Sequence, residues 1–295
     1  MGVYHAGSRA LQDRVGVRDL ADHVGRAIGE GIKPVAAAFL ELQPQLVLGA
    51  AAPETGRVWA SPLAGAPGFA RATGPRQLSV TGGVRPGDPL ATALVSEGTP
   101  VATIALDPRT CRRMRLNGRL RPTARGFAVA ADRVFSNCPK YIQRRESYEV
   151  VADRGPGIPR HGAELTAWQR HFVAAADTFF LATVHGAGAE ASHRGGNSGF
   201  VRVASPNELT WRDYPGNSMF LTLGNLAADP RAGLLFLDWT TGTTLQLTGE
   251  ARTEFGADGE RRVRFRVAEV VETPSAVPLR WSAPAYSPAN PPAAD

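Results

Sequence analysis

Apolar and polar residues alternate in short runs along most of this chain, and long helical patterns are scarce. In Arg262–Val271, arginines alternate with Val and Phe at every second position. Successive side chains of a strand point to opposite faces, so this period of two predicts a strand with one polar and one apolar face. Gln45–Ala51 and Thr178–His185 are short apolar runs, which are also typical of strands. The chain is therefore predicted to be mainly β.

Helical patterns occur only as short segments between groups of strands. The predicted helices are Val35–Leu42, Pro89–Glu97, Ala167–Ala176 and Ser218–Ala227, and Thr166 is suited to cap the third of them. The remaining predicted strands are Val58–Leu63, Phe69–Ala72, Gln77–Val80, Val101–Asp107, Arg115–Arg119, Glu190–Arg194, Phe200–Val203, Glu208–Trp211, Ala232–Trp239 and Thr243–Ala251. Many short strands with few helices are typical of small antiparallel barrels, so we expect a mainly β fold with flanking helices.

The second half of the chain resembles the first. Residues 60–119 align without a gap over 191–250, at a constant offset of 131, and about a fifth of the aligned positions are identical. The glycine pairs Gly68/Gly199 and Gly118/Gly249 are among the identities. Glycine is retained where the backbone takes a positive φ or approaches another strand closely. We therefore interpret the chain as two copies of one domain in tandem.

This interpretation divides the chain into five parts. Residues 1–32 form a helical arm, 33–135 the first and degenerate barrel, and 164–272 the second barrel. Residues 136–163 are a linker that contains the sequence NCPKYIQRR. Residues 273–295 are a Pro/Ala-rich tail, and we expect its last part, 282–295, to be frayed. The two barrels are expected to form a pseudo-dimer within one chain.

Composition narrows the class of protein. The chain has 295 residues and only two cysteines, which excludes a disulfide framework and a cysteine-rich zinc site. No apolar run approaches the roughly 20 residues of a membrane-spanning helix, and the first residues have no apolar core of a secretion signal. We expect a cytoplasmic protein. The histidines show no metal-ligand spacing, so no metal site is expected.

The net charge of +6 has two interpretations. A solvated basic surface is favoured over a nucleic-acid interface. A nucleic-acid interface would use Arg109, Arg112, Arg113, Arg115, Arg119, Arg121 and Arg125, but aromatic residues for base stacking are not interleaved with them.

One glycine-rich segment matches a dinucleotide-binding pattern but is interpreted differently. Residues 186–191 follow a predicted strand and fit GxGxxG/A. A dinucleotide-binding site requires a helix to begin directly after the glycines, whereas the sequence Ser192–Gly196 is unfavourable for a helix. A hairpin turn is therefore predicted.

Ser192, His193, Arg194 and Gly195 form the segment richest in chemistry. They place a hydroxyl, an imidazole and a guanidinium beside glycines at the end of a strand, which suits an anion such as phosphate. The corresponding residues of the first copy, Ser61–Gly65, have lost most of these polar groups. The divergence favours one functional site and one structural partner. The alternative is a polar surface loop.

Other polar residues extend the candidate site. Asp213 and Tyr214 lie in the segment before a predicted helix, and Asn217 and Ser218 fall at the start of that helix, where they either cap it or bind an anion. Thr244 and Gln246 share the polar face of a strand, which reaches a ligand's carbonyl groups or faces water. Lys140 supplies a further anion contact or covers the domain junction, together with Arg144 and Arg145. Cys138 is interpreted as an idle thiol rather than a nucleophile, because no partner His and Asp can be identified.

Thr183 to Gly249 resembles the pyridoxamine 5′-phosphate oxidase-like flavoproteins, the FMN-binding split-barrel superfamily. The resemblance is carried by ASHRGG, GFVRV, DYPGN, NLAADPRAGLLFLDW and TLQLTG. The whole chain is similar to the tandem members, which share YHAGSRALQ and NCPKYIQRR. The resemblance implies six-stranded split barrels with flanking helices.

The resemblance also implies a function. FMN, or FAD as the alternative, would lie between the two barrels, with its phosphate at Ser192, His193, Arg194, Asn217 and Ser218. Its ring would meet Gly195 and Gln246. A flavin-dependent oxidoreductase with a small-molecule substrate and NAD(P)H or another electron donor is expected, as a monomer or a homodimer. A non-catalytic flavin- or haem-binding module is the alternative.

The sequence departs from the true oxidase in two places. The oxidase has an Arg-Lys pair at the start of the helix, where this chain has Asn217 and Ser218. Its C-terminal substrate segment is replaced by the Pro/Ala-rich tail. Oxidation of pyridoxamine phosphate is therefore not expected. No catalytic acid or base is assigned, although Tyr214 and His193 are the best candidates.

Overall fold

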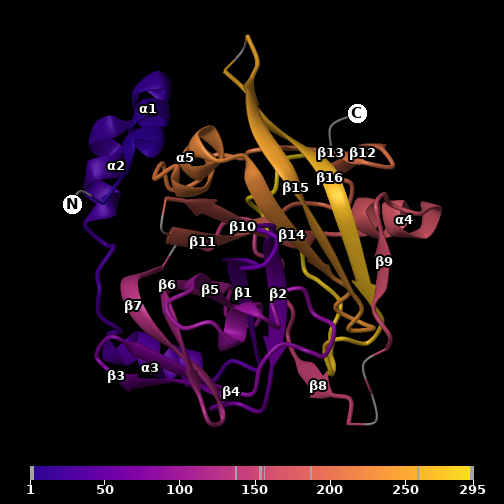
Figure 1. The fold of residues 1–295 in the computed structure, drawn as a ribbon. Coiled ribbons are helices and arrows are strands. Elements are labelled where there is room, and N and C mark those ends of the chain that lie inside the picture. Colours follow the sequence, from indigo (N-terminus) through magenta and orange to yellow (C-terminus); the bar gives the residue numbers. More distant parts are fainter. Residues whose placement is uncertain are drawn as a thin grey trace.

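The structure is a computed structural model that describes residues 3–136, 138–152, 155, 157–186, 188–257 and 259–292. Two large antiparallel sheets form the centre of the structure (Figure 1). The first has the strand order β2-β1-β5-β6-β7-β4-β3. Its strands are β1 (Gln45–Ala51), β2 (Val58–Ala64), β3 (Ala70–Gly74), β4 (Gln77–Thr81), β5 (Pro100–Asp107), β6 (Arg112–Thr123) and β7 (Gly126–Ser136).

The second sheet has the equivalent strand order, β11-β10-β14-β15-β16-β13-β12. A short strand, β9 (Arg160–Gly162), pairs with β16 outside this path. The other strands are β10 (Thr178–His185), β11 (Gly188–Gly195), β12 (Val201–Ser205), β13 (Glu208–Arg212), β14 (Arg231–Leu237), β15 (Thr244–Phe255) and β16 (Arg261–Thr273). The fold-class prediction, a mainly β chain built of two split barrels, is confirmed. The resemblance implied six strands in each barrel, whereas the first sheet has seven.

The offset of 131 seen in the sequence also relates irregular features of the two sheets. A bulge between Asn117 and Gly118 in β6 corresponds to one between Thr248 and Gly249 in β15. A side chain on either glycine would overlap the backbone of the neighbouring strand. Gly68 and Gly199 both have a positive φ, 92° and 88°. The shared glycines therefore meet backbone requirements that the two sheets have in common.

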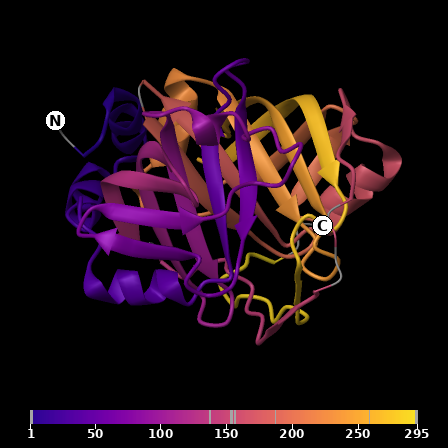
Figure 2. The ribbon, with the colours of Figure 1, turned by 60° about the horizontal axis from the view of Figure 1, so that its bottom comes forward.

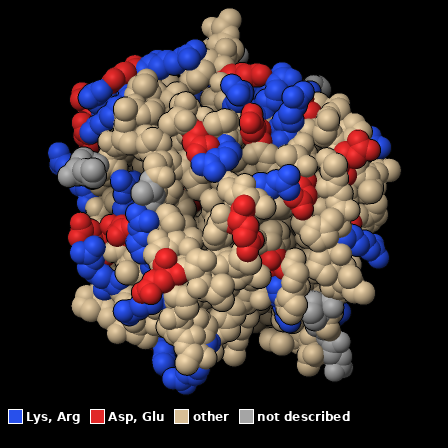
Figure 3. Space-filling model, viewed as in Figure 1, with Lys and Arg blue, Asp and Glu red and all other residues tan. Residues whose placement is uncertain are grey.

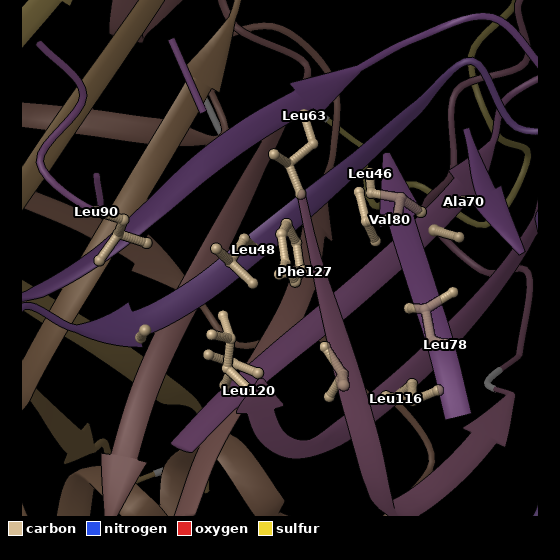
Figure 4. Close-up of a cluster of buried hydrophobic side chains, with 14 of the residues drawn as sticks. Leu46, Leu48, Leu63, Ala70, Leu78, Val80, Leu90, Leu116, Leu120 and Phe127 are labelled. Carbon is tan, nitrogen blue, oxygen red and sulfur yellow. The ribbon is translucent and has the colours of Figure 1, made fainter. Parts of the chain in front are cut away.

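Each sheet encloses its own apolar core, and a third core joins them. Figure 4 shows Leu46, Leu48 and Phe127 among the buried side chains inside the first sheet. The core between the sheets contains Val47 and Ile104 from the first sheet and Phe180 and Leu235 from the second. Figure 2 shows the two sheets side by side, in purple and in orange to yellow. Burial of apolar surface between them holds the two halves together.

Short helices cover the ends of the sheets. They are α1 (Ala6–Val15), α2 (Arg18–Gly25), α3 (Pro34–Glu41), α4 (Ala167–Ala175) and α5 (Leu221–Ala228). Thr166 caps α4 through a capping box, as its sequence position indicates. Figure 1 shows α1 beside α5, so the start of the N-terminal arm packs on the second half of the chain, whereas Gly29 near its end pairs with Val134 of β7.

Three expectations about local structure are wrong. Pro89–Glu97 contains only a 3₁₀ turn, Ala93–Val95, because most of its backbone N–H groups bond to carbonyls three residues back rather than four. A strand after β6 was predicted only in the second copy, but β7 is its counterpart; its Ala-rich sequence conceals the period of two. The tail through residue 292 is not frayed. Its β17 (Leu279–Trp281) pairs with β8 (Tyr148–Val150), and Asn290 Nδ2 donates to Gln143 Oε1.

Candidate functional site

A cavity of about 280 Å³ lies where β11, β6, the start of α5 and the N-terminal arm meet. We call it the His193 cavity. Seven residues selected from the sequence line it: His193, Arg194, Gly195, Asp213, Tyr214, Asn217 and Ser218. β11 is the end strand of its sheet, so residues of β6 from the other sheet reach the same space. The site is therefore built from both halves of the chain.

His193 is buried at the wall of this cavity and is held in its neutral form. Arg113 Nη1 lies 2.8 Å from His193 Nδ1. A guanidinium can only donate, so Nδ1 accepts and the ring proton lies on Nε2. Burial, and then the positive charges of Arg113 and Arg194, lower the pKa of His193 well below its usual value. The Nε2–H is buried and has no hydrogen-bond partner among the described residues.

Arginines outnumber carboxylates around the cavity. Arg115 pairs with Glu190 at 2.5 Å, and Arg194 and Arg261 share Asp213 at 3.5 and 3.0 Å. Arg113 has no carboxylate within ion-pair distance among the described residues. Burial, and then the charges of Arg115 and Arg194, lower the pKa of Arg113 to about 9. Arg113 stays charged near neutral pH, but its charge is poorly compensated.

Several donors at this site also lack acceptors. The Nε atoms of Arg113, Arg115 and Arg194 are buried and unpaired within the described part of the chain. Buried donors without partners are rare in folded proteins, because each costs about 1–3 kcal/mol. Together with Nε2 of His193, they form a set of N–H groups that an anionic oxygen would satisfy.

The start of α5 adds backbone donors to the same space. Leu221, Thr222 and Leu223 line the cavity, and no side chain caps the helix. The first turn of a helix carries free N–H groups and a partial positive charge, which favours anions. Phe220, the residue before the helix, has a left-handed φ of 54°. Asn217 does not cap α5; its Oδ1 accepts from Met219 N within the preceding loop.

An aromatic wall closes another side of the cavity. Tyr141, from the junction between the sheets, has its ring 5.2 Å from that of Tyr214 and donates its hydroxyl proton to Pro215 O at 2.9 Å. Burial raises the pKa of both tyrosines. Both hydroxyls therefore remain protonated at neutral pH and can donate hydrogen bonds.

The N-terminal arm forms the remaining wall. Val15 and Val17 line the cavity, and α1 fixes the loop before α5. Gln12 Nε2 donates to Met219 O at 3.0 Å, and Ser8 Oγ donates to Phe220 O at 3.3 Å. The position of the loop that faces the cavity thus depends on residues near the start of the chain.

Residues 165–291 match the family described as Pyridoxamine 5'-phosphate oxidase. These residues, somewhat less than half of the chain, are similar to that family. The matched segment includes β10, β11 and α5, and therefore most of the second-half residues of the His193 cavity. It does not include β6, which supplies Arg113 and Arg115 to the cavity.

Parts of this chain are also similar to solved structures. HupZ of Group A Streptococcus is 12% identical, with 37% of this chain and 98% of that chain covered and a TM-score of 0.30. A FAD-binding protein of Mesorhizobium loti is 14% identical, with coverage of 40% and 98% and a TM-score of 0.29. The FAD binding protein of Mycobacterium smegmatis is 12% identical, with coverage of 40% and 98% and a TM-score of 0.27. Among curated proteins, none matches the sequence.

The other residues selected from the sequence lie elsewhere. Ser192 is buried behind the cavity, where its Oγ accepts from Thr222 Oγ1 and from Arg194 Nη1 and so positions both. Thr244 and Gln246 of β15 do not line the cavity; Gln246 contacts Ser61 of β2 instead. Lys140 is exposed and outside the lining.

The sequence reasoning missed the contribution of the first sheet to the site. Arg113 and Arg115 occupy the positions that correspond, at the offset of 131, to Thr244 and Gln246. In each half, the equivalent of β6 faces the second strand of the other half, so the partners of His193 come from the other copy. The resemblance already placed the ligand between two barrels, and applying that exchange to the aligned copies would have identified both arginines.

Arg145 of the NCPKYIQRR segment has a structural contact rather than a place in the cavity. It forms a buried ion pair with Asp177, at 2.7 Å. In the described part of the chain, no helix is long and apolar enough to cross a membrane, and no three His, Cys, Asp or Glu residues are placed to hold a metal ion. Figure 3 shows basic and acidic residues interspersed over one face of the molecule, rather than a continuous basic surface.

Proposed function

We propose that this chain binds FMN in the His193 cavity and acts as a flavin-dependent oxidoreductase. The observation that carries the proposal is the set of buried, uncompensated N–H donors around Arg113, at the uncapped start of α5. A phosphate group would supply the missing negative charge and the missing acceptors. The family match of residues 165–291 and the resemblance to FMN-binding split barrels support the same ligand.

The residues present suit the parts of a flavin mononucleotide. Arg113 and Arg194 would hold the phosphate together with the first turn of α5. The Nε2–H of His193 would donate to a ring oxygen or nitrogen, and Tyr141 and Tyr214 offer aromatic surface. A cavity of about 280 Å³ is at the small end of ligand pockets, which favours FMN over FAD.

The chemistry would come from the bound flavin, which accepts and donates hydride at its N5 atom. This chain would bind and orient the ring. His193 is held neutral by Arg113, so its role would be that of a hydrogen-bond donor and not of a general acid. We propose a small organic substrate and a nicotinamide dinucleotide or another reductant as the electron donor.

One observation weighs against the haem alternative. A histidine that binds iron through Nε2 must have its proton on Nδ1. Here Nδ1 accepts from Arg113, which leaves the proton on Nε2. A flavin-binding module without turnover is the better alternative, and it is distinguished by adding NAD(P)H to the flavin-loaded protein under anaerobic conditions. Bleaching of the flavin band supports an oxidoreductase, and an unchanged spectrum supports the non-catalytic module.

Titration of FMN, followed by quenching of its fluorescence, tests the binding site. Arg113→Gln removes the charge at the cavity, whereas Arg119→Gln makes the same change at an exposed position of the same strand. We expect Arg113→Gln to weaken FMN binding about 10- to 100-fold, as for a lost charged hydrogen bond, and Arg119→Gln to leave it unchanged. Wild-type protein that binds no FMN at micromolar concentrations would refute the proposal, as would equal affinities of the two variants.

A further inference from the structure

The site that corresponds to the His193 cavity in the other half of the pseudo-dimer is built differently. At the offset of 131, Ser61 of β2 corresponds to Ser192 of β11, and Gln246 of β15 corresponds to Arg115 of β6. β2 packs against β15, as β11 packs against β6. Gln246 Nε2 donates to Ser61 Oγ at 2.9 Å and to Ala60 O at 3.1 Å. The two positions therefore meet, but with an amide in place of a guanidinium.

A carboxylate of the chain itself lies at this meeting point. Asp88 Oδ1 accepts from Ser61 Oγ at 2.6 Å and from the backbone N–H of Leu90 at 2.8 Å. Its Oδ2 accepts from Gln246 Nε2 at 3.2 Å. We call Ser61, Asp88, Leu90 and Gln246 the Asp88 cluster. A hydroxyl, a backbone N–H and a side-chain N–H converging on oxygens are the kind of contacts that a bound anion receives.

The sequence shows that this carboxylate is particular to the first half. The residue that corresponds to Asp88 is Met219, in the loop before α5. The His193 cavity therefore has Arg113 and Arg115 but no counterpart of Asp88. The Asp88 cluster has the carboxylate, and Thr244 and Gln246 stand in place of the two arginines. The two sites therefore differ in what fills this position: the Asp88 cluster has a carboxylate of its own among neutral donors, whereas the His193 cavity has arginines and no carboxylate at the corresponding residue.

We propose that Asp88 is a built-in anion that fills the ligand's phosphate position in the first half, so that each chain binds a single FMN. This inference rests on the proposed function for the His193 cavity, and it names Asp88 as the residue that decides the stoichiometry. Burial raises the pKa of Asp88 to about 6, which agrees with a carboxylate enclosed by protein rather than by water. At neutral pH its charge repels a phosphate as well as occupying its place.

FMN stoichiometry, measured by equilibrium dialysis, tests this directly. Wild type is expected to bind one FMN per chain. Asp88→Ser combined with Gln246→Arg removes the built-in anion and restores the arginine that the His193 cavity has at this position, so the double variant should bind two. Gln246→Arg alone is the matched control and should remain at one, because its arginine pairs with Asp88. Two FMN bound by wild type, or one by a folded double variant, would overturn the inference.

A second experiment does not depend on flavin binding. Asp88→Gly removes the side chain that accepts from Ser61, Leu90 and Gln246, and leaves space for an anion. Asp88→Asn keeps a side chain of the same size in that space. Both variants are made with Arg113→Gln, which silences the His193 cavity. Inorganic phosphate, at about tenfold its Kd for the Asp88→Gly protein, should raise the Tm of that protein by a few degrees. The same phosphate concentration should leave the Tm of the Asp88→Asn protein unchanged. Equal responses of the two proteins would overturn the inference. Wild type without any bound FMN would refute the proposed function, and this second experiment would still decide the role of Asp88.

Discussion

At the scale of single residues, His193 and Arg113 determine each other's state. The guanidinium donates to Nδ1 at 2.8 Å and so keeps the imidazole neutral, with its proton on Nε2. The neutral imidazole, in turn, cannot compensate the charge of Arg113. The need for an anion at this site therefore follows from two side chains that lie 80 residues apart in the sequence.

Asp88 gives a prediction about stability and pH. Its pKa is about 6 in the folded protein, above the ordinary 3.8, so the folded protein binds this proton more tightly than the unfolded chain does. The stabilising contribution is complete below pH about 4 and is lost as the pH rises through about 6. We expect Asp88→Asn to be more stable than wild type at pH 7.5 by about 1–3 kcal/mol, and this advantage to shrink toward pH 4.

Urea unfolding of the two proteins between pH 4 and 8 measures this difference. The groups that hydrogen-bond to Asp88, on Ser61, Leu90 and Gln246, do not titrate in this range, so the difference reports Asp88 alone. A stability difference that grows toward low pH would contradict the assignment.

At the scale of elements, the junction segment is anchored to the second sheet by a buried charge pair. Arg145 and Asp177 are both less than a tenth exposed, and burial raises the pKa of Asp177 and lowers that of Arg145. We expect Arg145→Met to destabilise the protein by about 3 kcal/mol, because it leaves Asp177 buried without a partner. Arg145→Met with Asp177→Leu should recover most of the loss. Thermal unfolding of the single and double variants gives the coupling, and additive effects would contradict this account.

The contact between α1 and α5 gives a second prediction at this scale. A methyl group on Gly224 of α5 would overlap Ser8 of α1. Alanine favours a helix over glycine by about 1 kcal/mol, so without this contact Gly224→Ala would stabilise the protein. We expect the opposite: a lower Tm and faster cleavage of the N-terminal arm in limited proteolysis. Gly29→Ala, at a position with free space, is the control. A higher Tm for Gly224→Ala would show that the arm does not pack on α5.

At the scale of the whole molecule, the sequence predicted the architecture better than the site. Alternation and the offset of 131 identified most strands, and Gly118 and Gly249 mark equivalent bulges. These signals are local or depend on a constant spacing. The helix predicted at Pro89–Glu97 is wrong: its backbone bonds reach mainly three residues back, and only a 3₁₀ turn forms.

The candidate site was only half visible because its parts belong to different sheets. His193 and Arg194 are adjacent in the sequence, so their chemistry could be recognised. Their association with Arg113 depends on how the two halves pack, and no local pattern records that packing. Gln246 was assigned to the same site from the polar face of its strand and from the resemblance, although it contacts Ser61.

The central claim is that the His193 cavity recognises a phosphate group on a flavin. The most direct measurement compares the Kd values of FMN and riboflavin, which differ only in that phosphate, for wild type and Arg113→Gln. We predict that wild type binds FMN at least about 100-fold more tightly than riboflavin, and that Arg113→Gln reduces this ratio at least tenfold while riboflavin binding changes little. Equal affinities of wild type for the two flavins, or a ratio that Arg113→Gln leaves unchanged, would contradict the account.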